Sequence, residues 1–93
     1  MRNEENVLMF LDLCLKTNNS TCLHELFNLF FTIEEKEHLA SRMQIIRALL
    51  DKKLSQREIS ENMQVSISQI TRGSNALKIA NQDLLKFIEN HLR

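Results

Sequence analysis

Polar side chains that could recognise DNA are concentrated in one short part of the chain, residues 56–78. Four of them suit phosphate oxygens or base edges and lie close together: Arg72, Ser74, Asn75 and Lys78. Three polar residues that could reach bases precede them: Ser68, Gln69 and Thr71. Ile67 could contact a thymine methyl group or pack against the preceding turn. Gln56 and Arg57 are placed to contact the DNA backbone.

The charge distribution favours the same region. The net charge is zero, with 12 basic and 12 acidic residues. Residues 1–41 are predominantly acidic and contain only three basic residues, Arg2, Lys16 and Lys36. Residues 42–78 contain three acidic residues and an excess of basic ones: Arg42, Arg47, Lys52, Lys53, Arg57, Arg72 and Lys78. A local basic excess is typical of a nucleic-acid-binding surface, even in a chain that is neutral as a whole.

The pattern of residues 54–78 predicts two short helices joined by a tight turn. Two capping boxes mark their starts, Ser55-x-x-Glu58 and Ser66-x-x-Gln69. Apolar residues at helical spacing supply a small shared core: Ile59, Met63, Val65, Ile67, Ile70 and Leu77. This pattern indicates a helix-turn-helix, although Gln64 occupies the position where the turn usually has glycine.

The remainder of the chain is expected to be helical because it is poor in helix breakers and strand formers. The 93 residues include no proline, one glycine, and no tyrosine or tryptophan. Helices are expected at about residues 4–16, 21–31 and 33–51, with Thr32 and Glu35 as the capping box of the third. A last helix follows Asn81 as its cap. The sequence thus predicts an all-α single domain of six helices.

The first two expected helices are apolar on almost every side. A helix of this kind must be buried on all sides, which a chain of 93 residues cannot easily provide. We therefore expect a second copy of the protein to cover them.

No pattern in the sequence indicates an enzyme or a metal site. There are no paired carboxylates, nucleophile–base pair, phosphate-binding loop or metal-ligand spacing, and the three histidines are scattered. Cys14 and Cys22 are expected to be reduced thiols. No signal peptide or long apolar span is present, so a cytoplasmic protein without membrane association is expected.

Gly73 lies inside the second helix of the helix-turn-helix, where glycine costs about 1 kcal/mol relative to alanine. Two interpretations account for it. The bare Cα could allow another helix to pack closely, or it could allow a ligand ring or a phosphate to approach the backbone.

The sequence resembles the trp repressor family in these residues. Ser55-Gln-Arg-Glu58, Ile70-Thr-Arg-Gly-Ser-Asn75 and Leu77-Lys78 carry the resemblance, and the string from Thr71 to Asn75 is highly specific. Leu29-Phe-Phe-Thr-x-x-Glu35 and Leu39-x-x-Arg42 fall at the family's spacing. The looser resemblance extends from about Phe10 to Leu92.

The resemblance implies an intertwined homodimer of six-helix chains. Residues 1–51 would be dimerisation core helices, residues 54–78 the helix-turn-helix reading head, and residues 81–93 a C-terminal core helix, within one trp-repressor-like domain over residues 1–93. The homodimer would bind double-stranded operator DNA with L-tryptophan as corepressor. It would repress tryptophan biosynthesis and transport genes.

The resemblance also implies a ligand site. Arg42 and Arg72 would flank the indole ring, with Arg72 also meeting the carboxylate, and Gly73 would give the ring room. From the partner chain, Thr32 and the backbone carbonyls of Leu29 and Phe31 would meet the polar end of the amino acid.

At the DNA surface, the resemblance implies contacts by Gln56, Arg57, Ile67, Thr71 and Lys78, while Ser68 and Gln69 replace smaller family residues.

One position departs from the family's ligand site. The family has serine where this chain has Ala76, and that hydroxyl helps to hold the ligand's amino group. Because a neutral hydrogen bond contributes about 0.5–1.5 kcal/mol, weaker or less selective tryptophan binding is expected. Two other functions stay open: a helix-turn-helix regulator that responds to another indole-type ligand, and a helical dimeric adaptor that does not bind DNA.

Overall fold

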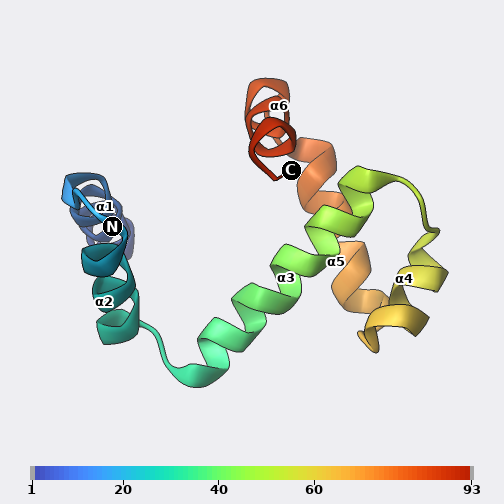
Figure 1. The fold of residues 1–93 in the computed structure, drawn as a ribbon, viewed down its shortest axis with the longest axis horizontal. Helices are drawn as coiled ribbons and strands as arrows, with labels where there is room; N and C mark the ends of the chain where they lie inside the picture. The colour runs from blue at the N-terminus through green and yellow to red at the C-terminus, as the bar shows by residue number, and fades with distance from the viewer. Residues whose placement is uncertain (1, 93) are drawn as a thin grey trace. The chain divides into compact units, whose positions relative to one another are not determined.

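The computed structural model describes residues 2–92, and these form six α-helices without a strand, which confirms the all-α expectation (Figure 1). The helices are α1 (Arg2–Lys16), α2 (Ser20–Phe30), α3 (Ile33–Asp51), α4 (Gln56–Met63), α5 (Ile67–Ile79) and α6 (Gln82–His91). The first helix begins two residues earlier than expected. The chain divides into two compact units, Met1–Lys36 and Glu37–Arg93. No helix in the described part of the chain combines the length and the apolar character needed to cross a membrane.

Side-chain caps start the helices where the sequence predicts them. Ser55 Oγ accepts from the Glu58 amide at 3.1 Å, and Glu58 Oε1 accepts from the Ser55 amide at 3.0 Å. Ser66 and Gln69 form the same reciprocal pair at the start of α5. Thr32 and Glu35 do so at the start of α3, with distances of 3.1 and 2.8 Å. Asn81 caps α6. The three predicted capping boxes are therefore confirmed.

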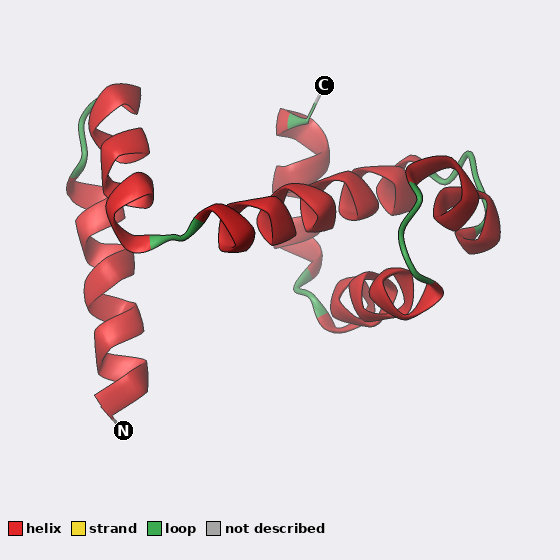
Figure 2. Ribbon diagram, turned by 90° about the horizontal axis from the view of Figure 1, so that it is seen from below, coloured by secondary structure: helices red, strands yellow, loops and turns green. Residues whose placement is uncertain are grey.

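The N-terminal unit is a pair of helices held together by phenylalanine. Figure 2 shows α1 and α2 side by side, joined by a short loop. The Phe10 ring of α1 meets the rings of Phe27, Phe30 and Phe31 edge to face, with centroids 5.2–5.6 Å apart. No residue of either helix is buried. Large apolar side chains are left exposed on this pair: Val7, Leu8, Met9, Leu11, Leu13, Leu15, Leu29 and Phe30.

The core of the C-terminal unit lies where three helices meet. Ile45 of α3, Ile59 of α4 and Ile70 of α5 are buried, and four partly buried residues surround them: Ala48, Leu49, Met63 and Val65. Figure 1 shows α5 crossing α3 at a steep angle, with α4 close to α5. The core predicted for the helix-turn-helix is thus present at Ile59, Met63, Val65 and Ile70, and α3 completes it. The prediction was wrong for Ile67, which is 50% exposed, and Leu77 is half-buried outside this cluster.

The turn between α4 and α5 forms without glycine. Gln64 takes the left-handed conformation, with φ 54° and ψ 42°, which glycine adopts more easily. The Gln64 amide donates to the Ser60 carbonyl. The Ser60 hydroxyl in turn donates to the Val65 carbonyl at 2.6 Å. This side-chain hydrogen bond holds the turn closed from within α4.

Gly73 lies where α5 crosses α3. It is buried, and a Cβ atom added to it would lie 2.9 Å from Ile45 Cγ2 and 3.6 Å from Leu49 Cδ1. The structure therefore gives Gly73 a role in close helix packing, the first of the two interpretations. The approach of a ligand ring to the same backbone stays a prediction.

Candidate DNA-binding and ligand-binding site

The predicted DNA-binding residues of α5 form an open face along the helix. Ser68, Thr71, Arg72 and Lys78 are exposed, and Ile67 is 50% exposed in the first turn. Because Ile70 and Gly73 lie against the core, Ser68, Thr71 and Arg72 project away from it, with Ile67 and Lys78 at the side of this face. The structure thus presents a polar and basic surface on a helix that is anchored by its apolar side.

Gln69 is held differently from its neighbours. Its Oε1 accepts from the Ser66 amide at 3.2 Å, as part of the capping box, and the residue is half-buried. Its amide nitrogen is then the group that could reach DNA. Ser68 Oγ lies 3.1 Å from Ser66 Oγ, so the polar side chains of this first turn are organised by the cap.

The start of α4 adds two more predicted DNA-binding residues. Arg57 Nε lies 3.5 Å from Glu61 Oε1, but the two side chains are 88% and 67% exposed. An exposed ion pair of this kind contributes little and is easily exchanged for a phosphate. Gln56 Nε2 donates to Ser74 Oγ of α5 at 3.3 Å. This contact joins two segments that are 18 residues apart in the chain.

The charges of the C-terminal unit are mostly unpaired. In residues 2–92, ion pairs are found at Lys16–Asp12 and Arg57–Glu61, so seven described basic residues of the unit have no carboxylate partner: Arg42, Arg47, Lys52, Lys53, Arg72, Lys78 and Lys86. Hydrogen bonds from the Ser55 amide, and then from its hydroxyl, lower the pKa of the Glu58 carboxyl. Glu58 therefore acts as a cap, and the basic excess of the unit faces solvent.

Three of the predicted ligand residues lie on α3 and α5, in the C-terminal unit: Arg42, Arg72 and Gly73. Arg72 precedes Gly73 on α5, and Gly73 packs against Ile45 of α3. Arg42 lies three residues before Ile45, so it is on the same face of α3, one turn away. Both arginine side chains are exposed. Their approach to one indole ring stays a prediction, since the Gly73 backbone itself is occupied by Ile45 and Leu49 of α3.

The other predicted ligand residues lie at the end of α2 and the start of α3, in the N-terminal unit. Leu29 is 78% exposed. Phe31 is half-buried and stacks on Phe27 with the ring centroids 5.1 Å apart. Thr32 is exposed, and its hydroxyl oxygen accepts from the Glu35 amide. Thr32 thus caps α3, and its contact with a ligand stays a prediction.

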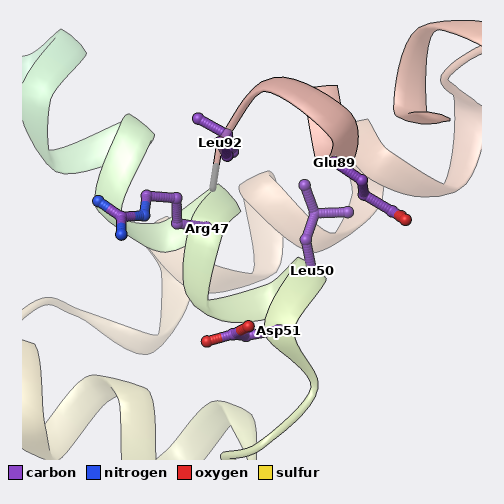
Figure 3. A pocket seen from close by; sticks show the side chains of 5 residues that line it. All are labelled: Arg47, Leu50, Asp51, Glu89 and Leu92. Carbon is purple, nitrogen blue, oxygen red and sulfur yellow. The ribbon is translucent and has the colours of Figure 1, made fainter. Parts of the chain in front are cut away.

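Three surface hollows within residues 2–92 are lined by residues other than the predicted site residues. Figure 3 shows one, a cavity of about 150 Å³ between α3 and α6. Arg47 and Glu89 point to opposite sides of it, with Leu50, Asp51 and Leu92 between. No group of three or more potential metal ligands is found in the described part of the chain.

The sequence did not reveal the contact between Gln56 and Ser74. Both residues were identified as candidates for DNA contact, each from its own neighbourhood. Nothing in the local pattern indicates that one side chain donates to the other, because the contact depends on how α4 packs against α5.

Comparison with known proteins connects this architecture to one family. The model of the family described as "Trp repressor protein" matches residues 5–92. A "Trp operon repressor homolog" of Chlamydia caviae is 47% identical over 88 residues, covering 95% of this chain and 87% of the relative. One from Chlamydia trachomatis serovar L2 is 46% identical over 94 residues, covering 99% and 100%. One from Mannheimia succiniciproducens is 37% identical, covering 97% and 89%. The chain belongs to the Trp repressor family.

Proposed function

We propose that the protein is a transcriptional repressor that binds operator DNA as a homodimer when L-tryptophan occupies its corepressor pocket. Its targets would be genes for tryptophan biosynthesis or transport. The observation that carries this proposal is the helix-turn-helix of a Trp repressor family chain. Its α5 is anchored by Ile70 and Gly73 and presents an exposed polar and basic face.

The DNA contacts are assigned to that face and to the start of α4. Arg57, Arg72 and Lys78 would neutralise phosphates, and each such contact makes affinity depend on salt. Base edges would be met by residues of the first turns of α5: Ile67, Ser68, Gln69 and Thr71. Gln56 would bind the phosphate backbone of the DNA. Ordered water molecules would carry part of the base recognition, as they do in the complex of the trp repressor with its operator.

A homodimer is supported by the exposed apolar surface of α1 and α2. Leu15 is 85% exposed, Leu8 and Met9 are each 64% exposed, and neither helix buries a residue. A surface of this extent on one helix pair is typical of a protein–protein interface. Cover by a second copy also agrees with the family's assembly.

The ligand site is proposed at the crossing of α3 and α5. Arg42 and Arg72 would stack on the indole ring beside Gly73, and Arg72 would bind the carboxylate. Thr32, with the carbonyls of Leu29 and Phe31, would be supplied by the partner copy.

The proposed mechanism is a population shift. L-Tryptophan would bind better to the conformation in which the two α5 helices are about one DNA turn, roughly 34 Å, apart. A ligand shifts this equilibrium only by the difference between its affinities for the two conformations. Tryptophan should therefore raise the affinity for operator DNA by the same factor by which operator DNA raises the affinity for tryptophan.

The test is operator binding with and without L-tryptophan. The full chain is titrated against DNA from upstream of its own gene in a gel shift, and L-tryptophan binding is measured by calorimetry. We expect tryptophan to increase operator affinity, and Lys78→Ala to weaken it. No heat of binding, together with unchanged operator affinity, would contradict the corepressor assignment. Unchanged DNA behaviour of Arg57→Ala and Lys78→Ala would favour an adaptor instead.

A regulator that responds to another indole-type ligand is favoured by one observation. Ala76 of α5 has no hydroxyl to offer the ligand's ammonium group, and it is exposed. A ligand without the ammonium, such as indole-3-propionate, would lose less at this site. Stronger operator retention with indole-3-propionate than with tryptophan would support this second function, and the reverse order would exclude it.

A further inference from the structure

We propose that Ser74 is a positioning residue for DNA binding, because its hydroxyl holds the Gln56 amide in the orientation that contacts a DNA phosphate. The inference rests on the proposed function and adds to it a residue that does not itself need to touch DNA. It also connects the two helices of the helix-turn-helix by a polar contact, in addition to their apolar core.

The contact between Gln56 and Ser74 is directional, whereas the rest of the α4–α5 interface is not. Ile59, Ile70 and Met63 pack as apolar groups, which position the helices but do not hold the exposed Gln56 side chain in one direction. Among the described residues, the side-chain hydrogen bond between these two helices is Gln56 Nε2 to Ser74 Oγ, at 3.3 Å. It therefore holds the Gln56 side chain in one direction at the start of α4.

The chemistry of the glutamine amide leaves groups for a second partner. An amide has two N–H donors and one carbonyl acceptor, and Ser74 takes a single N–H. The second N–H is free to donate to a phosphate oxygen beside Arg57. With Ser74 replaced by alanine, the same side chain can rotate among several rotamers, and ordering it on DNA then costs conformational entropy.

Ser74 is itself held in place by the core. It follows Gly73, whose backbone lies so close to α3 that an added Cβ would be 2.9 Å from Ile45 Cγ2. Ser74 is half-buried, while Gln56 is exposed. The packing of Gly73 on α3 therefore determines where the Ser74 hydroxyl lies, and this hydroxyl binds the Gln56 amide at the edge of the DNA-binding face.

The experiment is a double-mutant cycle on the full chain with L-tryptophan present. Fluorescence anisotropy measures operator affinity for wild type, Ser74→Ala, Gln56→Ala and the double variant. Each single variant should bind about twofold to tenfold more weakly, the range given by one neutral hydrogen bond. The double variant should be no weaker than Gln56→Ala, because Ser74 acts only through Gln56. Asn62→Ala, an exposed amide on the same helix, is the matched control and should bind as wild type does.

Two further measurements show whether Ser74→Ala weakens DNA binding through the orientation of Gln56 and not through lost stability or a changed number of charged contacts. The melting temperature of Ser74→Ala should stay near that of wild type, and Ser74→Thr, which keeps the hydroxyl, should restore affinity. The dependence of affinity on salt should be unchanged in Ser74→Ala, since a neutral contact releases no counterion, whereas Arg57→Ala should reduce the slope by about one.

The outcomes distinguish this inference from the function on which it rests. If wild type binds operator DNA and Ser74→Ala binds equally well, or if the two single effects add in the double variant, the positioning role is overturned while the repressor function stands. Failure of wild type to bind operator DNA under any ligand condition would overturn both.

Discussion

Replacing Gly73 with alanine distinguishes the two explanations for a glycine inside α5. The new Cβ would lie 2.9 Å from Ile45 Cγ2, closer than carbon atoms approach in proteins. Ile45 is only 1% exposed, and its β-branched side chain has one strongly preferred rotamer in a helix, so the methyl group cannot rotate away. Overpacking of this kind typically costs about 1–3 kcal/mol. Alanine is also better than glycine in a helix by about 1 kcal/mol, so we expect the free energy of unfolding to decrease by about 1 kcal/mol overall.

The assay is thermal unfolding of the ligand-free protein, followed by circular dichroism at fixed protein concentration. A loss of about 1 kcal/mol lowers the melting temperature by roughly 4–8 °C in a chain of this size. Ala76→Gly, at an exposed position of the same helix, measures the propensity difference without a packing term and should destabilise by about 1 kcal/mol. If Gly73→Ala instead stabilises the ligand-free protein by that amount and weakens only tryptophan binding, the packing argument is refuted.

Three further substitutions test the turn and the cap. Gln64→Gly should raise the free energy of unfolding by about 0.5–1 kcal/mol, because glycine adopts the left-handed conformation without steric strain. Asn62→Gly, within α4, is the control and should lower the free energy of unfolding in the same urea titration. Ser60→Ala should destabilise by about 1 kcal/mol through loss of the 2.6 Å hydrogen bond, and an unchanged urea midpoint would mean that the turn closes without it. The pKa of Glu58 is lowered in the folded state, so its contribution is complete above the ordinary carboxyl pKa and is lost as pH falls through the lowered value. Glu58→Gln should therefore reduce the loss of stability in acid, measured by melting temperature across pH, and an identical acid profile would contradict this.

Local features of the fold could be predicted from the sequence because they are encoded within a few residues. A capping box needs only a serine or threonine and a glutamate or glutamine three residues later, and the boxes at Thr32, Ser55 and Ser66 are confirmed. The burial of Ile59 and Ile70 followed from helical spacing in the same way. The family assignment is also confirmed by the match of the family model to residues 5–92. It could be made from the sequence because the string between Thr71 and Asn75 is highly specific.

Contacts between distant segments could not be predicted. The packing partner of Gly73 is Ile45, on another helix, so the sequence left its role open between packing and ligand approach. The hydrogen bond between Gln56 and Ser74 depends on the angle between α4 and α5. The ligand and DNA contacts of the individual residues stay predictions, because they depend on groups that one chain does not contain.

The helix pair α1–α2 buries none of its residues, and this has a consequence for gene control. If a second copy covers these helices, folding and assembly are one bimolecular event, and mass action sets the amount of folded protein. At low expression the dimer would increase with the square of the chain concentration. Repression would then switch on over a narrow range of synthesis rates, even at constant tryptophan. Newly made chains would also pass through a period in which Leu8, Met9 and Leu15 are available to proteases and chaperones.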